Sequence, residues 1–132
     1  MSLNALRVFL SERVESFEEL EALLLLRGAG VPLTTFDLSE RLGLSEASTS
    51  LALQALVTRG LLRSLESGAA ARYWYSAENP FDSDVERLAA TYRNERMLVV
   101  ELMAKNALAR IRSAALRTFA EAFRVRGRKD DS

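Results

Sequence analysis

Apolar residues recur at helical spacing through most of the chain, and this pattern predicts a mainly α-helical protein. A first short helix is indicated near the N-terminus by the apolar positions Leu3, Leu6, Phe9, Leu10 and Val14. A second helix is expected from Phe17 to about Arg27, because the Ser16 hydroxyl can accept from the backbone N–H of Glu19, whose side chain can reach back. Gly28, Gly30 and Pro32 are expected to end it and to make a short connection.

Two further helices with a tight turn between them are predicted in the middle of the chain. The first covers 35–42, with Thr34 as its N-cap and Gly43 at its left-handed end. The second covers 46–59, with Ser45 as its N-cap. This is the sequence form of a helix-turn-helix. Its apolar seam repeats at i, i+3, i+4 and i+7 and consists of Leu38, Leu42, Leu44, Thr49, Leu53 and Leu56.

A hairpin is expected next, with strands at 61–65 and 72–76 and a tip at 66–71. A helix, a helix-turn-helix and then a hairpin follow one another in the order of a winged helix. The predicted fold class is therefore mainly α, a winged helix-turn-helix with a two-stranded wing and long C-terminal helices.

A long helix is predicted to begin at Asp82 or Ser83. Its apolar stripe alternates steps of four and three with one polar interruption, at Phe81, Val85, Leu88, Tyr92, Glu95, Val99 and Leu102. Asn106 is expected to cap a further helix, and a charged tail follows from Arg124.

The predicted helices divide the chain into two parts. Residues 1–80 hold the N-terminal helices and the winged helix-turn-helix with its wing, and residues 81–132 form a C-terminal helical dimerisation segment with the charged tail. The stripe between Val85 and Leu102 is too apolar for a lone helix in water, so it must pack on the N-terminal helix, on a second subunit, or on both. We predict a homodimer through the terminal helices.

Composition lowers the expectation of an enzyme. The chain has 132 residues, 18 basic and 18 acidic, with no histidine and no cysteine. The commonest general base and metal ligand is therefore missing, as are thiolate nucleophiles and sulfur-bound zinc. No catalytic, cofactor or metal site is predicted. The N-terminus shows no signal-peptide pattern and the longest aliphatic run is Leu23–Leu26, so we expect a cytoplasmic protein without a membrane span.

Two segments carry a family resemblance. The run at 38–45, Leu-Ser-Glu-Arg-Leu-Gly-Leu-Ser, and the run at 53–62, Leu-Gln-Ala-Leu-Val-Thr-Arg-Gly-Leu-Leu, resemble the MarR-like winged-helix transcription regulators. The resemblance spans about Phe17–Ser76. It implies a recognition helix placed in the major groove of double-stranded DNA and dimerisation through terminal helices.

The candidate DNA-binding residues follow from that resemblance. Three on the second helix of the helix-turn-helix would read or orient on the bases, and three at its end and on the wing would grip phosphates; together they are Ser48, Ser50, Gln54, Arg59, Arg63 and Arg72. The helix departs from the family pattern because it is poor in arginine and Glu46 at its start would repel phosphate. Residues 1–60 contain five arginines against eight acidic residues, which favours the alternative, a protein–protein interaction module without DNA binding.

Several features are open to more than one interpretation. Leu51 would meet a thymine methyl group, belong to a protein interface, or be buried. Arg63 and Arg72 would hold DNA or be solvated strand residues, with Glu66 as a candidate ion-pair partner. Tyr73, Trp74 and Tyr75 suggest either a base-stacking platform or packing, and packing is favoured.

Charged clusters in the second half of the chain also allow two interpretations. The acidic residues Asp82, Asp84 and Glu86 suggest a cation site or, more simply, the dipole of a helix start. A basic set would contact nucleic acid or be a solvated helix end, which is the favoured interpretation; it comprises Arg110, Arg112, Arg117, Arg124, Arg126, Arg128 and Lys129.

Overall fold

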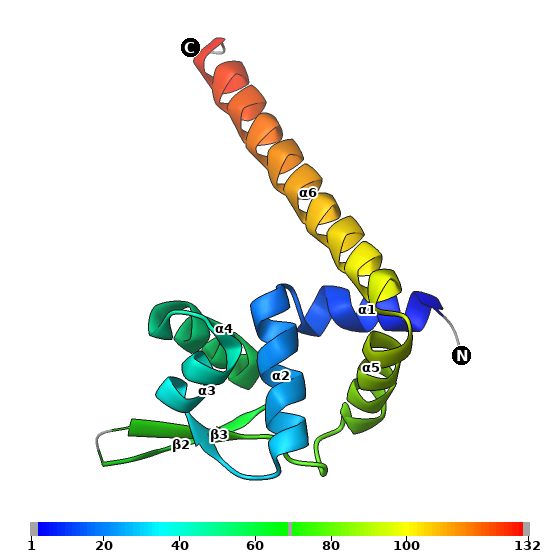
Figure 1. The fold of residues 1–132 in the computed structure, drawn as a ribbon. Helices are drawn as coiled ribbons and strands as arrows, with labels where there is room; N and C mark the ends of the chain where they lie inside the picture. Colours follow the sequence, from blue (N-terminus) through cyan, green and yellow to red (C-terminus); the bar gives the residue numbers. More distant parts are fainter. Residues whose placement is uncertain (1–2, 69, 131–132) are drawn as a thin grey trace.

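The computed structural model describes residues 3–68 and 70–130, with Ser67 and residues 125–130 described by their backbone alone. Six helices and three strands occur in these ranges (Figure 1). In chain order they are α1 (Leu3–Arg13), α2 (Phe17–Ala29), β1 (Leu33–Thr34), α3 (Thr35–Leu42), α4 (Glu46–Thr58), β2 (Arg63–Ser67), β3 (Ala70–Trp74), α5 (Asp82–Asn94) and α6 (Arg96–Asp130). The predicted class, a mainly helical winged helix-turn-helix, is confirmed.

The helix-turn-helix begins and ends at its predicted caps. Thr34 accepts from the backbone N–H of Asp37, whose carboxylate in turn accepts from the Thr34 N–H at 3.2 Å. Gly43 has a φ of 69°, in the left-handed region where a side chain is strained. Ser45 accepts from the Ser48 N–H at 3.1 Å and starts α4. These local bonds fix the turn between α3 and α4.

The sheet has one strand more than the sequence predicts. Its order is β1-β3-β2 with both pairings antiparallel, and Leu33 lies opposite Tyr73. The predicted two-stranded wing is confirmed as the pair β2 and β3, and β1 adds a third strand at the edge of β3. With only two residues, β1 is too short to show an alternating pattern, and it exists because β3 offers it a free edge.

The core is formed by residues from both ends of the chain. Leu10 of α1, Leu23 of α2, Leu56 of α4 and Leu88 of α5 are fully buried in one cluster. Tyr73 of β3 joins them with 7% of its surface exposed. The first helix and α5 therefore complete the hydrophobic core of the winged helix.

The C-terminal helices are broken at a different place from the one predicted. One helix ends at Asn94 and the next begins at Arg96, with Glu95 in a non-helical conformation between them (φ −140°, ψ 58°). Asn106 starts no helix; it lies inside α6, where its side chain donates to the backbone oxygen of Arg7 at 3.2 Å. The polar interruption of the predicted stripe is thus the break itself.

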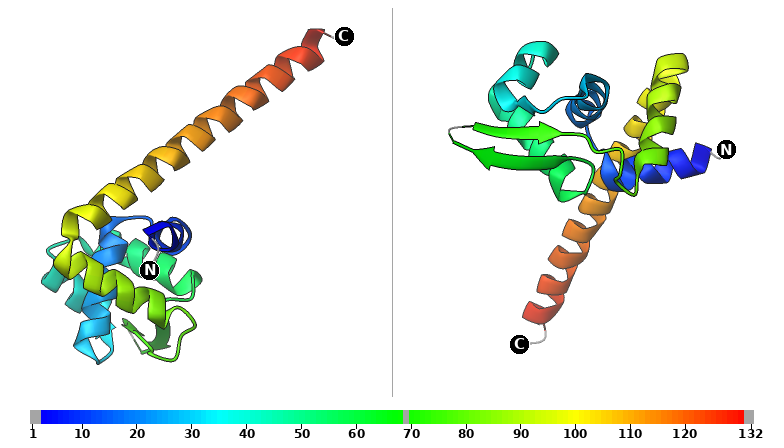
Figure 2. Two further views of the ribbon diagram at one scale, coloured as in Figure 1. Left: turned by 90° about the vertical axis from the view of Figure 1, so that its right-hand side faces the viewer. Right: turned by 90° about the horizontal axis from the view of Figure 1, so that it is seen from below.

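The last helix leaves the rest of the molecule. Its first turns lie against α1 and α5, and the remainder projects away as a single rod (Figures 1 and 2). Val99 and Met103 are buried at its base, whereas Ile111 and Phe119 are each 65% exposed. Thirty-five residues correspond to about 50 Å of helix. No helix in the described ranges combines the length and apolarity that crossing a membrane requires.

Candidate nucleic-acid interface

The second helix of the helix-turn-helix, α4, presents one face to the core and the other to solvent. Thr49, Leu53 and Leu56 are buried, as their spacing predicts, and α4 packs on α2 and α3 through them. The helix phase assumed for the recognition face is therefore confirmed. Leu51 lies on the outer face with 70% of its surface exposed, which excludes its burial in this chain.

The predicted base-reading residues lie on or beside this outer face. Ser48 and Gln54 are exposed, and Ser50 is half-buried. The Gln54 amide nitrogen donates to the Ser50 hydroxyl at 3.2 Å, so these two polar side chains form one unit a helical turn apart. A glutamine amide can pair with the edge of an adenine, and the Ser50 bond orients it.

The two wing arginines share one face of the hairpin. Arg63 lies opposite Trp74 and Leu65 opposite Arg72, and residues two apart on a strand point to the same side. Both arginines are exposed. Neither forms an ion pair with Glu66 among the described residues, and Glu66 alternates to the other face. Arg63 and Arg72 are therefore diagonal neighbours on an outward face.

Arg72 also lies close to the start of α3. Hydrogen bonds from Thr34 lower the pKa of the Asp37 carboxyl, and the charges of Arg41 and Arg72 lower it further. The positive charge of Arg72 is thus partly offset by a carboxylate. Of the two wing arginines, Arg63 has the freer charge.

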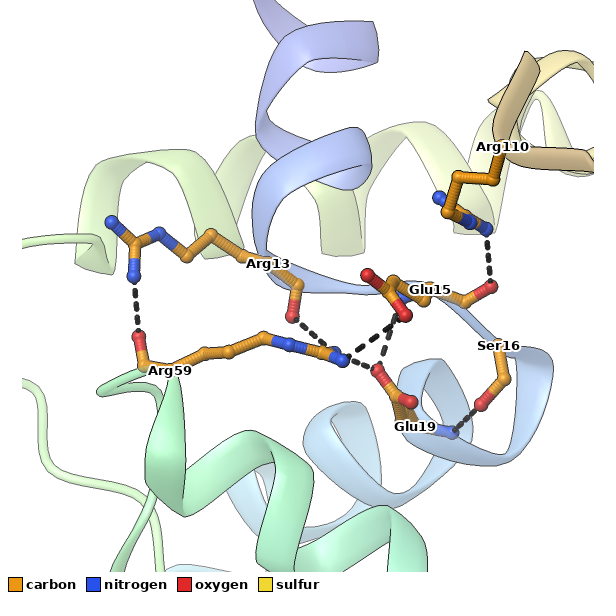
Figure 3. Close-up of polar contacts among 6 residues, drawn as sticks. All are labelled: Arg13, Glu15, Ser16, Glu19, Arg59 and Arg110. Atoms are coloured by element: carbon orange, nitrogen blue, oxygen red, sulfur yellow. Dashed lines mark hydrogen bonds and ion pairs between the residues drawn. The ribbon is translucent and has the colours of Figure 1, made fainter. Parts of the chain in front are cut away.

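The third predicted arginine faces the interior. Arg59 is the C-cap of α4, and its guanidinium forms ion pairs with Glu15, at 3.2 Å, and with Glu19 of α2. Its side chain is 21% exposed and that of Glu19 is 10% exposed. Figure 3 shows the guanidinium pointing toward the connection between α1 and α2. In this arrangement Arg59 is committed to neighbouring carboxylates.

A shallow groove runs beside the outer face of α4. It has a volume of about 460 Å³ and lies between the starts of α3 and α4 and the strand β3. Its lining is small or apolar apart from Glu46 and the hydroxyls, and consists of Thr34, Thr35, Phe36, Glu46, Ala47, Ser50, Ala70 and Ala71. Phe36 is 57% exposed at this site. The groove offers an apolar surface next to the polar recognition face.

Two rings of the aromatic run at the end of β3 pack against the hydrophobic core. Tyr73 is buried and Tyr75 packs against the core, which confirms the packing interpretation for these two rings. The Tyr75 hydroxyl donates to the Asp82 carboxylate at the start of α5. Burial, followed by this bond, raises the pKa of Tyr75 to about 12. Asp82 and Asp84 lie in the first turn of α5, where a helix favours negative charge.

The described part of the chain contains no group of three residues suited to hold a metal ion. Of the basic C-terminal set, Arg110 is not a freely solvated residue, because it donates to the backbone oxygen of Glu15 at 3.1 Å. Arg112, Arg117 and Arg124 are exposed. The side chains of Arg126, Arg128 and Lys129 lie outside the described ones.

Comparison with known proteins gives structural neighbours alone. No protein-family model matches the chain, and the search of curated proteins found no relative. The chain is similar to the structure of reduced HlyU from Vibrio cholerae, with 23% sequence identity and a TM-score of 0.53. The match covers 70% of this chain and 90% of the HlyU chain. The adhesin competence repressor AdcR from Streptococcus pyogenes is 17% identical, covers 83% of this chain and 81% of its own, and gives a TM-score of 0.50.

These likenesses establish the fold. The chain is similar in fold to these two structures, and its own order of elements is that of a winged helix. The helix α4 lies where the sequence predicted it. The wing strands, predicted at 61–65 and 72–76, lie instead at Arg63–Ser67 and Ala70–Trp74, so the paired strands extend further into the predicted tip at 66–71.

Proposed function

We propose that this protein is a DNA-binding transcription regulator that acts as a homodimer. The observation that carries the proposal is the winged helix itself, whose capped second helix presents Ser48 and Gln54 to solvent beside a wing with two outward arginines. This is the arrangement in which a helix enters the major groove while a hairpin contacts the adjacent backbone.

In this proposal the six predicted residues have unequal roles. Gln54, oriented by Ser50, reads a base edge, and Ser48 gives a neutral contact to phosphate or base. Arg63 and Arg72 grip the backbone. Arg59 gives no phosphate contact, because it is paired with Glu15 and Glu19.

The dimer in this proposal is built on α6. Its projecting part carries apolar side chains that are 48 to 69% exposed, namely Leu108, Ile111, Leu116, Phe119 and Phe123. A helix in a protein gains most of its stability from packing of its apolar face, and in the described part of the chain no other element lies along this part of α6. A second copy supplies the same stripe by symmetry.

The salt dependence of DNA binding tests the proposal. Two arginines per subunit give four phosphate contacts per dimer, so log affinity should fall with log salt at a slope of about −3.6. Fluorescence anisotropy on duplexes selected from genomic fragments, and on random duplexes, measures the slope and the preference together. Arg63→Ala with Arg72→Ala should remove most of the slope, and Gln54→Ala should reduce the preference instead.

Absence of binding has a definite meaning. If no duplex binds below about 10 μM at low salt, the regulator proposal fails, since non-specific binding alone reaches that range in DNA-binding proteins.

A second candidate is a protein-interaction module that uses the same face. The specific observation in its favour is the exposure of Leu51 and Phe36, 70% and 57%, with Glu46 lining the same groove as Phe36 and Glu18 and Glu19 lining the same pocket as Leu51. Large exposed apolar side chains mark protein contacts more often than phosphate contacts. In the binding assay, this candidate predicts that wild type and the Arg63→Ala, Arg72→Ala variant behave alike, with no duplex bound by either.

A further inference from the structure

The ends of α1 and α4 are joined by two arginines that cap each other's helix. Arg13 is the last residue of α1, and its guanidinium donates to the backbone oxygen of Arg59 at 2.9 Å. Arg59 in turn donates to the backbone oxygen of Arg13 at 3.2 Å (Figure 3). Carbonyls at a helix end lack partners within the helix, so each arginine supplies what the other helix needs.

The connection between α1 and α2 adds two carboxylates to this junction. Glu15 and Glu19 both pair with the Arg59 guanidinium, and the Glu15 N–H donates to the Glu19 carboxylate at 3.0 Å. The predicted capping box of α2 therefore closes on Glu15, while Ser16 accepts from the Glu19 N–H as expected. The end of the recognition helix is thus fixed by charge to residues 13–19.

The same connection is bonded to the base of α6. Arg110 donates to the backbone oxygen of Glu15 at 3.1 Å, and Asn106 donates to that of Arg7 in α1. Asn106 is 6% exposed, and one guanidinium nitrogen of Arg110 is buried without a hydrogen-bond partner among the described residues. Glu15 therefore belongs to two links at once, with its carboxylate on Arg59 and its carbonyl on Arg110.

We propose that Arg59 is a positioning residue for the recognition helix and that Glu15 transmits the position of α6 to it through Arg110. The packing supports a relay, because α4 packs mainly on α2 and α3 whereas α6 packs mainly on α1 and α5. A shift of α6 moves the Glu15 backbone and with it the carboxylate that holds Arg59. The consequence for DNA rests on the proposed function: a second copy that fixes the position of α6 also fixes the positions of the two recognition helices.

Hydrogen exchange on the free protein tests the relay without DNA. Arg110→Ala should speed exchange of the amides at 59–61, at the end of α4, by about two- to tenfold, the range for one lost hydrogen bond. Arg112→Ala is the control: it removes the same charge two residues further along α6, at an exposed position, and should leave the exchange rates of those amides unchanged. If Arg110→Ala changes exchange only within α6 and residues 13–19, the relay is refuted.

Carboxylate variants test the positioning role on DNA. Glu15→Gln removes the negative charge that pairs with Arg59. Glu18→Gln removes an exposed negative charge nearby, at the start of α2, that forms no ion pair with Arg59. Both raise the net charge by one, so an equal gain in affinity would show a general electrostatic effect and overturn the proposal. We expect Glu15→Gln to bind a selected duplex about three- to tenfold more weakly than Glu18→Gln, corresponding to about one weakened charged hydrogen bond.

Variants at Arg59 separate positioning from direct contact. Arg59→Lys keeps the charge but lacks the planar fork that reaches Glu15, Glu19 and the Arg13 carbonyl together, so affinity should fall with an unchanged salt slope. Arg63→Ala should instead reduce the slope by about two units per dimer. A reduced slope in Arg59→Ala would show that Arg59 touches phosphate and would overturn the proposal. If wild type binds no duplex, the proposed function fails and the exchange experiment alone decides the relay.

Discussion

Leu51 and Leu56 are the same residue type on one helix and lie in opposite surroundings. Leu56 is completely buried, whereas Leu51 is 70% exposed. Leu56→Ala should lower the free energy of unfolding by about 2–5 kcal/mol, because a buried leucine leaves a cavity. Leu51→Ala is the matched control and should change it by less than about 0.5 kcal/mol. Urea denaturation followed by circular dichroism measures both, and equal stabilities would show that the helix phase is wrong.

Burial of Tyr75, together with its bond to Asp82, should make stability fall at high pH. The pKa of Tyr75 is raised to about 12, so the folded protein holds this proton more tightly than the unfolded chain, whose tyrosine titrates near its ordinary value of 10. A raised folded-state pKa gives a contribution that is complete below pH 10 and is lost as the pH rises toward 12.

Tyr75→Phe isolates that contribution. The variant cannot ionise at this position, so its free energy of unfolding should fall less than that of wild type between pH 10 and pH 12. Tyr92→Phe, at a half-buried position on α5, serves as the control. Parallel curves for wild type and Tyr75→Phe would contradict the assigned pKa.

Sequence reasoning at the residue scale located outward and inward positions but missed long-range partners. The spacing along α4 placed Gln54 outside and Leu53 inside, as found. It also assigned Arg59 to DNA, although that residue pairs with Glu19, 40 positions away. Periodicity within one helix contains no information about which charged residue from another helix faces it. The acidic pair Glu18 and Glu19 was visible in the sequence, but its partner was not.

At the scale of elements, capping residues determined how well boundaries could be predicted. The helix α3 runs over Thr35–Leu42 as predicted, because Thr34 and Gly43 mark both of its ends. Of the residues expected to end α2, Gly28 lies within the helix, whereas Gly30 is its left-handed C-cap. A glycine stops a helix only where the chain takes a positive φ, and the sequence does not say which of two neighbouring glycines does so.

Two glycines give opposite predictions for substitution by alanine. Gly43→Ala should destabilise the protein by about 1–2 kcal/mol, since the position has a φ of +69°, in the left-handed region. Gly28→Ala should stabilise it by about 0.5–1 kcal/mol, because the residue is helical and an added Cβ meets nothing within 4 Å. Thermal unfolding of the two variants beside wild type tests the pair. Melting temperatures that shift in the same direction would contradict the assigned backbone conformations.

The break between α5 and α6 shows why the stripe from Val85 to Leu102 misled. Glu95 fits a helical pattern and is neither glycine nor proline, yet its backbone is not helical. The turn allows α6 to change direction after α5, so that Val99 packs into the core. A stacking contact between Arg96 and the Tyr92 ring, at 4.8 Å, spans the break. Packing of the two helices on α1 outweighs the local helix preference of this segment.

At the scale of the whole molecule, the sequence indicated the order of elements but not the direction of α6. The winged helix could be predicted because each of its parts has a local signal in caps, spacing and turn residues. The projection of α6 depends on how α1 and α5 pack at its base, which no local signal reports. The exposed apolar stripe on the projecting part of α6 belongs to the predicted dimerisation segment, and the proposed dimer is built on it.

The proposed dimer leads to a truncation that spares the core. Removal of residues 111–132 deletes Ile111, Leu116, Phe119 and Phe123, all of which are exposed, and keeps the buried Val99 at the base of α6. The shortened chain should remain folded and be monomeric, because it loses the apolar face and no core residue. Size-exclusion chromatography with light scattering at tens of micromolar gives the mass, and circular dichroism checks the fold.

Substitution in the full-length chain supplies the control for that truncation. Ile111→Glu with Phe119→Glu places charge on the stripe and should also give a monomer, whereas Arg112→Ala with Arg117→Ala alters exposed basic positions of the same rod and should leave the dimer intact. A helix whose apolar face is not packed loses most of its stabilisation, so the monomeric variant should also lose helical signal from the rod. A wild-type chain that runs as a monomer, with its helical content intact, would exclude self-association as the reason for the exposed stripe.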